Sequence, residues 1–193
     1  PTISIASWKT PGYPNGEAWG LGSRSRDASE RTVVVVTDTT VLVNLIHIDR
    51  TEFFARIPDY EFILPEEVFQ EVMDEDQRAA LGRAVADNVL RVETITDVHE
   101  IALKIELSAR LGQGESACLA IASARGYAVA TDDIKAARVA TELLGEGRIL
   151  TTPGLLVLAI RAGLMTVEEA DACKRTLESR RFIMSFGSFR EIV

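Results

Sequence analysis

A set of carboxylates stands out because predicted strands and helices would gather them in one place. Asp38 ends the apolar run 33–36, and the pair Asp132-Asp133 ends the run 128–131. Glu71 lies in a helical stretch that follows a strand, and Glu115 opens a helix after the segment 112–114. Carboxylates held together repel one another unless cations neutralise them, and Mg²⁺ and Mn²⁺ prefer oxygen ligands. The pattern therefore predicts metal-assisted phosphoryl chemistry.

Each of these carboxylates also has a purely structural explanation. Asp38 and the pair Asp132-Asp133 precede helices, where aspartate caps the first turn. Glu115 lies in a first turn, where it stabilises the helix dipole by about 0.3–1 kcal/mol, and Glu71 could lie on a solvated helix face. Their combination favours a site, because like charges at short range cost free energy. Two divalent ions would remove that cost and could bind both the attacking water and the leaving oxygen at phosphorus.

Hydroxyl and basic side chains beside these carboxylates are candidates for contacts with a substrate. Thr40 or Thr131 could position a water molecule or a phosphate oxygen. Lys135 and Arg138 follow the Asp132-Asp133 pair, and Arg138 could reach a phosphate, with a solvated helix face as the structural alternative. Thr40, Thr131 and Arg138 are the substrate contacts that the sequence predicts.

Composition narrows the class of protein. The chain has 193 residues and a net charge of -8, which argues against a generally basic surface of the kind that binds nucleic acid. A nuclease with bound metal is still compatible, because the ions invert the local field. Cys118 and Cys173 fall in helical patterns and are interpreted as core residues of a reduced, cytoplasmic protein. No apolar stretch approaches the ~20 residues of a membrane span, and the first 32 residues do not resemble a signal peptide.

The chain divides at about residue 33. Residues 1–32 contain both tryptophans and several glycines without a regular period, so they predict an irregular N-terminal arm or a remnant of cloning. Residues 33–193 predict one α/β domain. Strands are expected at 33–37, 61–64, 89–92, 127–131 and 148–150, and helices at 39–48, 51–57, 65–72, 75–87, 97–110, 115–125, 134–144, 153–162 and 167–180.

Strands that alternate with helices indicate a parallel sheet covered on both faces. Ligand sites in such sheets lie at the carboxyl ends of the strands, where Asp38 and the pair Asp132-Asp133 are expected. The sequence thus predicts both the sheet and the edge of it that carries the site.

With these residues in place, residues 33–180 resemble a PIN domain. The matching segments come in the family's order: the strand that ends at Asp38, the helix that carries Glu71, the segment 112–117 with Glu115, and the segment 131–138 with its double aspartate. A glutamate at the third acidic position and a double aspartate at the fourth are similar to the VapC-like toxins of toxin–antitoxin pairs.

The resemblance implies a three-layer α/β/α sandwich with a central parallel sheet. It also implies a ribonuclease that depends on Mg²⁺ or Mn²⁺, with Asp38, Glu71, Glu115 and Asp133 as catalytic metal ligands. The family spacing favours Asp133 over Asp132, and Asp132 stays open as a ligand. Because basic residues near the predicted site are few, we expect weak RNA affinity and strong salt sensitivity.

The resemblance further implies a cognate antitoxin that blocks the acidic pocket and a homodimer formed through helices outside it. Residues 1–32 have no counterpart in the family pattern, and the basic, apolar segment 180–186 could serve a dimer, an antitoxin or RNA, or pack as a final element. The alternative function is a PIN-like binding module without turnover. A haloacid-dehalogenase-type phosphatase fits poorly, because position 40 is threonine where that class needs a second aspartate.

Overall fold

The computed structural model describes residues 32–193, so the predicted arm lies, except for its last residue, outside the described part. The described residues form one sheet of five parallel strands in the order β3-β2-β1-β4-β5. Its strands are β1 (Val33–Thr37), β2 (Tyr60–Pro65), β3 (Arg91–Glu93), β4 (Ala128–Ala130) and β5 (Ile149–Leu150). The predicted α/β architecture with a parallel sheet is confirmed.

The central strand β1 shows why the sheet is parallel and enclosed. Its four consecutive valines suit a strand, because β-branched side chains pack well on a pleated surface. Val35 and Val36 point to opposite faces, yet neither is exposed to solvent. A strand without a polar face must be covered on both sides, and the helices provide that cover.

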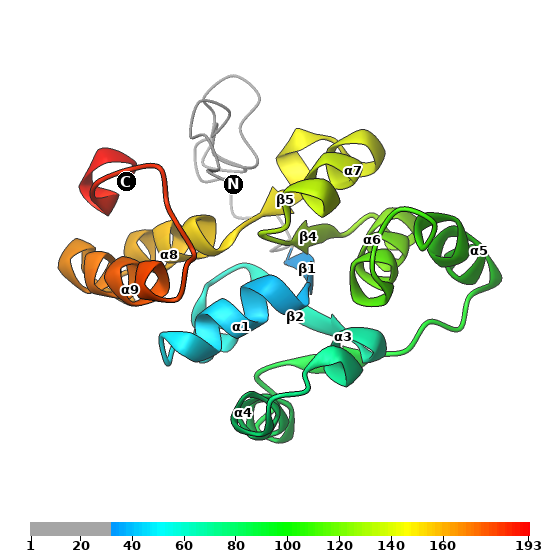
Figure 1. Cartoon of the computed structure of the whole chain (residues 1–193), viewed down its shortest axis with the longest axis horizontal. Coiled ribbons are helices and arrows are strands. Elements are labelled where there is room, and N and C mark those ends of the chain that lie inside the picture. Colours follow the sequence, from blue (N-terminus) through cyan, green and yellow to red (C-terminus); the bar gives the residue numbers. More distant parts are fainter. Residues whose placement is uncertain (1–31) are drawn as a thin grey trace, which may run out of the picture.

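Helices lie on both sides of the strands (Figure 1). On one side of the view are α1 (Thr39–His47), α8 (Thr152–Arg161) and α9 (Val167–Ser179), and on the other are α5 (Val98–Leu107), α6 (Gln113–Arg125) and α7 (Ile134–Leu144). The remaining helices are α2 (Phe53–Arg56), α3 (Glu66–Glu71) and α4 (Glu75–Ala86), with two short 3₁₀ turns at Glu146–Arg148 and Phe189–Glu191. Helix α6 contacts β1, β2 and β4, so it covers the middle of the sheet.

The strand order creates a switch point at the carboxyl ends of β1 and β4. From β1 the chain proceeds to β2 and β3 on one side, and it then crosses back to β4 and β5 on the other. Thr37 of β1 pairs with Ala130 of β4, and the N–H of Asp38 donates to the carbonyl of Ala130 at 2.9 Å. Connections leave these two strands in opposite directions, and the resulting crevice is where open α/β sheets bind ligands.

Several element boundaries differ from those that the sequence predicts. Helix α6 begins at Gln113, two residues before the expected start, because the carboxylate of Glu115 accepts the N–H of Gly112 and closes the first turn around it. The helix expected at 51–57 is the single turn α2, and the strand expected at 89–92 lies at 91–93. The predicted helix at 97–110 ends at Leu107.

The C-terminal segment packs on the domain without becoming a regular strand or a long helix. After α9 the chain runs irregularly to the 3₁₀ turn, and Met184, Phe186 and Phe189 enter the core. Cys118 and Cys173 are both free and buried, as the sequence predicted. Among residues 32–193, no helix combines the length and the apolar character that crossing a membrane requires.

Candidate metal centre

Asp38 occupies the switch point, and three hydrogen-bond donors hold its carboxylate there. One carboxylate oxygen accepts the N–H of Thr39 at 2.7 Å and caps α1. The other accepts the hydroxyls of Thr40 and Thr131, each at 2.9 Å. Burial raises the pKa of Asp38, the hydrogen bonds oppose that rise, and the negative charge of Glu71 adds to it. Asp38 is thus both a cap and a fixed, buried carboxylate.

Thr40 and Thr131 orient the carboxylate by donating their hydroxyl protons to Asp38. Their oxygens also accept backbone N–H groups, Thr40 from Asp132 at 3.1 Å and Thr131 from Asp133 at 3.2 Å. The two threonines therefore connect β1 and β4 through Asp38. Direct contact between either hydroxyl and a substrate stays a prediction.

Glu71 reaches the same place from the end of α3. Its carboxylate accepts the N–H of Gly114 at 2.8 Å and the hydroxyl of Thr39 at 3.1 Å. A Cβ atom at position 114 would overlap this carboxylate and would lie 2.9 Å from its Cδ and 3.0 Å from Cγ2 of Val68. Glycine at 114 is therefore what allows α3 and α6 to bring Glu71 and Glu115 together.

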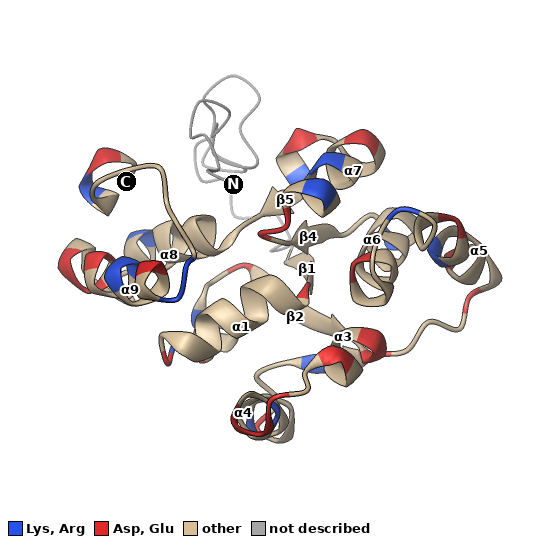
Figure 2. Ribbon diagram, in the orientation of Figure 1, with Lys and Arg blue, Asp and Glu red and all other residues tan. Residues whose placement is uncertain are grey.

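Glu115 interacts electrostatically with the other acidic residues. It accepts the N–H of Gly112 at 2.9 Å, which supports the predicted role in the first turn of α6. Burial is the main cause that raises its pKa, and the negative charges of Asp133, Asp38 and Glu71 raise it further. The carboxylates expected to form one cluster thus influence one another across α1, α3, α6 and α7. Figure 2 shows the acidic segments of these elements around the ends of β1 and β4.

The two adjacent aspartates have different surroundings. Asp133 caps α7 by accepting the N–H of Ala136 at 2.7 Å. Asp132 turns toward α1 and α8, where it accepts the amide of Asn44 at 2.9 Å, the N–H of Thr152 at 2.9 Å and the hydroxyl of Thr152. Burial raises the pKa of Asp132 to about 6, against the effect of these hydrogen bonds. Asp133 is the member of the pair whose charge acts on Glu115.

The residues that hold Asp132 were not among those predicted from the sequence. Asn44 is a buried amide on the apolar face of α1, between Leu42 and Leu45. Thr152 is the second residue after the end of strand β5. A polar residue on an otherwise apolar helix face was the available signal for Asn44. Thr152 repeats the pattern of a polar residue after a strand that had singled out Asp38.

The donor set fits a hard divalent cation better than a soft one. Carboxylates from several elements converge here, and burial raises the pKa of the Cys118 thiol well above its usual value, so it offers no thiolate. Within residues 32–193, no three or more His, Cys, Asp or Glu side chains stand in a preformed metal-binding arrangement. The acids are instead held by N–H and O–H donors. Burial is the main cause that raises the pKa of Asp38 and of Glu115, and the negative charges of neighbouring acids, which a cation would neutralise, raise both pKa values further.

Arg138 lies on the exposed side of α7, where it lines a pocket with Lys135, Asp132 and Asp133. Its contact with a phosphate stays a prediction, but the structure places it beside the acidic residues. The same pocket includes Arg181, Phe182 and Ile183 from the C-terminal segment, which the sequence had left open between several roles.

Comparisons with known proteins found similarity to a solved structure and to a protein family. The crystal structure of PAE2754 from Pyrobaculum aerophilum is similar over 69% of this chain and 92% of that one, with 18% sequence identity and a TM-score of 0.45. No match to a curated protein was found. The model of the family DUF3368, described as a PIN domain, matches residues 34–193, which include the sheet except Val33 and all of the acidic positions. The chain therefore belongs to the DUF3368 family of PIN domains.

Proposed function

We propose that this protein is a metal-dependent ribonuclease that hydrolyses RNA phosphodiester bonds, and that it is the toxin of a toxin–antitoxin pair. The observation that carries the proposal is the meeting of Asp38, Glu71, Glu115 and Asp133 at the switch point of a PIN-domain sheet. PIN domains are typically a nuclease fold, and no acidic position of the motif is missing here. The intact acidic set favours turnover over a binding module that has lost it.

The roles of the chain's own residues follow from their contacts. Asp38, Glu71, Glu115 and Asp133 would hold Mg²⁺ or Mn²⁺, with Asp132 supporting the site from behind. When bound, such ions activate a water molecule and stabilise negative charge at the phosphate. Thr40 and Thr131 keep the carboxylate of Asp38 oriented, and Gly114 keeps Glu71 in place. Orientation of this kind matters because displaced ligands commonly cost ten- to a hundredfold in affinity or activity.

Removal of metal tests the proposal directly. The purified protein, free of any partner, is expected to cut single-stranded RNA in Mg²⁺ or Mn²⁺, and EDTA is expected to abolish the cleavage because the carboxylates cannot bind a phosphodiester by themselves. Products would be followed on denaturing gels with end-labelled RNA. Cleavage that persists in EDTA would contradict the carboxylate–metal mechanism. A protein that never cuts RNA but binds a small antitoxin-like partner would favour the binding module.

Gly114→Ala is expected to lower RNA cleavage by roughly ten- to a hundredfold while the domain stays folded. The new methyl group would displace the exposed carboxylate of Glu71 and weaken its bond to the N–H of residue 114. Gly82→Ala is the matched control, because nothing lies within 4 Å of a Cβ atom there and alanine favours the interior of α4. Equal activity in both variants, measured with the fold checked by circular dichroism, would argue against the Glu71 contact.

We also propose a homodimer formed outside the site. Helix α5 supports this proposal, because Val98, Ile101 and Ile105 are 75%, 42% and 69% exposed along one side of it. Burial of such an apolar row is favourable. Light scattering of the wild type is expected to give a dimer mass, and Ile105→Asp is expected to give a monomer. A dimer that survives this substitution would place the contact elsewhere.

The antitoxin would act on the acidic site, and its gene is expected beside that of this protein.

A further inference from the structure

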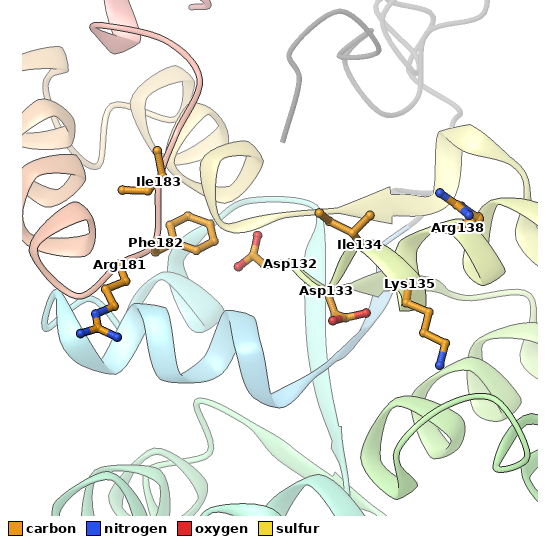
Figure 3. Close-up of a pocket in the computed structure, with 8 residues that line it drawn as sticks. All are labelled: Asp132, Asp133, Ile134, Lys135, Arg138, Arg181, Phe182 and Ile183. Atoms are coloured by element: carbon orange, nitrogen blue, oxygen red, sulfur yellow. The ribbon is translucent and has the colours of Figure 1, made fainter. Parts of the chain in front are cut away.

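A pocket of about 420 Å³ adjoins the acidic residues on the side of α7 and the C-terminal segment. Figure 3 shows the ring of Phe182 beside Asp132, with Lys135 and Arg138 on the α7 side and Arg181 on the opposite side. Asp132 and Asp133 form part of its lining, so a molecule in this pocket would lie directly against the candidate metal centre. The pocket has a size typical of small-ligand sites.

The cations of this pocket are available for a ligand. Lys135, Arg138 and Arg181 are exposed, and within residues 32–193 none of them forms an ion pair. The chain as a whole carries a net charge of -8, yet the lining of this one pocket includes three cations without an ion pair among the described residues. Such a group of cations attracts phosphate.

Arg181 has a backbone conformation that its type does not favour. It follows α9 with φ at 70°, and the N–H groups of Arg181 and Phe182 close the helix end on the carbonyls of Glu178 and Leu177 at 3.0 Å. Glycine is the usual residue at this position of a helix end. The other non-glycine residues with positive φ in the described chain are Asp49, Asp59 and Asn88, which tolerate it. An arginine kept at a strained position points to a role for its side chain.

Phe182 gives the pocket an aromatic wall. Its backbone is fixed by the bond to Leu177, and its ring is half-buried against the core, which leaves one part facing the pocket. Aromatic side chains beside basic groups bind single-stranded nucleic acid, because every base presents a flat face that can stack. The combination of free cations and one aromatic ring suits a nucleotide better than a purely apolar or purely anionic ligand.

We propose that this pocket binds one nucleotide of single-stranded RNA next to the bond that is cut, with its base on Phe182 and its phosphates at Arg138, Lys135 and Arg181. The proposal builds on the proposed ribonuclease function and adds the segment 181–183 to its substrate site. It assigns that segment to RNA rather than to an antitoxin or a dimer contact.

Binding and cleavage can be separated in the experiment. RNA binding would be measured by fluorescence anisotropy in the full-length Asp38→Asn protein with Mg²⁺, using a labelled single-stranded oligonucleotide and copies with one abasic nucleotide at each position in turn. In this background Phe182→Leu is expected to weaken binding of the intact RNA about tenfold. It should leave binding unchanged for the abasic copy that lacks the stacked base. Phe182→Tyr should bind the RNA as tightly as the parent protein, because tyrosine keeps the aromatic ring.

Arg181→Gly distinguishes the effect of the arginine side chain on RNA binding from the effect of its backbone conformation on stability. Relief of the positive φ is expected to raise the melting temperature by about 2–4 °C, while loss of the cation weakens RNA binding and lowers the slope of log affinity against log salt by about 0.7. Arg161→Ala removes an exposed arginine of α8 outside the pocket and is the matched control. It should leave the affinity close to that of the parent.

The outcomes distinguish this inference from the proposed function. RNA binding with the expected losses but without cleavage by the wild-type protein would overturn the ribonuclease and leave the pocket assignment standing. Cleavage by the wild type together with equal effects of Arg181→Gly and Arg161→Ala, or an effect of Phe182→Leu that no abasic copy removes, would overturn the pocket assignment alone. A labelled acidic peptide would be titrated in the same way. If Phe182→Leu and Arg181→Gly keep the RNA affinity of the parent but lose binding of this peptide, the pocket assignment is overturned in favour of a protein partner.

Discussion

Asp38→Asn is expected to reduce metal-dependent RNA cleavage by at least about a hundredfold while the domain stays folded. Asparagine caps helices as well as aspartate, so the bond from Thr39 to residue 38 can persist and α1 keeps its cap. The negative charge is lost where β1 and β4 meet, and an amide nitrogen replaces the oxygen that accepts the hydroxyls of Thr40 and Thr131, which must reorient. Without that charge the site attracts divalent cations much less strongly.

When metal is absent, Asp38→Asn should not lower the free energy of unfolding. Burial and the charge of Glu71 raise the pKa of Asp38, so the ionised carboxylate costs free energy in the folded state. In EDTA at neutral pH the asparagine variant should therefore unfold at the same urea concentration as the wild type or a higher one. Added Mn²⁺ should stabilise the wild type and not the variant.

Glu106→Gln is the control for Asp38→Asn, because Glu106 is an exposed acid of α5 away from the site. It should leave both cleavage and the response to Mn²⁺ unchanged. Full activity of Asp38→Asn would show that the buried carboxylate serves only as a helix cap. A loss of activity that accompanies unfolding in EDTA would point to the same conclusion.

Asp132→Ala is expected to lower the free energy of unfolding by about 3 kcal/mol at pH 5, because it leaves the amide of Asn44 and both donors of Thr152 without an acceptor. Those bonds join α1, α8 and the end of β4. Asp133→Ala should cost only about 1 kcal/mol, the usual effect of a lost cap, but should reduce cleavage as Asp38→Asn does.

The effect of Asp132→Ala should depend on pH with a definite sign. The pKa of Asp132 is raised from 3.8 to about 6 in the folded state, so its contribution to stability is complete below pH 4 and falls as pH rises through 6. The difference between wild type and variant should therefore be smaller at pH 7.5 than at pH 4, by as much as about 3 kcal/mol. Urea titrations in EDTA at both pH values would measure it. Lost cleavage with unchanged stability and no such pH dependence would instead make Asp132 the fourth metal ligand.

Sequence patterns predicted the sheet because its determinants are local. The valines of β1 and the small residues of β4 require cover on both faces, and the helices between them have clear starts and stops. The positions of Asp38 and of the pair Asp132-Asp133 followed from the rule that the ends of parallel strands meet at one edge of the sheet. Helix α7 was predicted with the observed bounds because Asp133 and Gly145 mark its two ends.

Other features depend on contacts between distant residues, and the sequence could not show them. Successive side chains at the end of a strand point in opposite directions, so the order of Asp132 and Asp133 alone does not say which faces the site. The need for glycine at 114 arises only when α3 packs against α6 and brings Glu71 to it. The pocket at Phe182 likewise requires the C-terminal segment to return to α7, a contact that has no local signature.

The caps have a consequence for how such a protein changes over generations. Asp38, Glu115 and Asp133 each satisfy the backbone at the start of a helix, and an amide side chain can do that as well as a carboxylate. Selection that acts only on correct folding would therefore accept asparagine or glutamine at these places. Under the proposed ribonuclease function, descendants that have lost cleavage can keep the same architecture after a single exchange, and they should be recognisable by amides in the place of these acids.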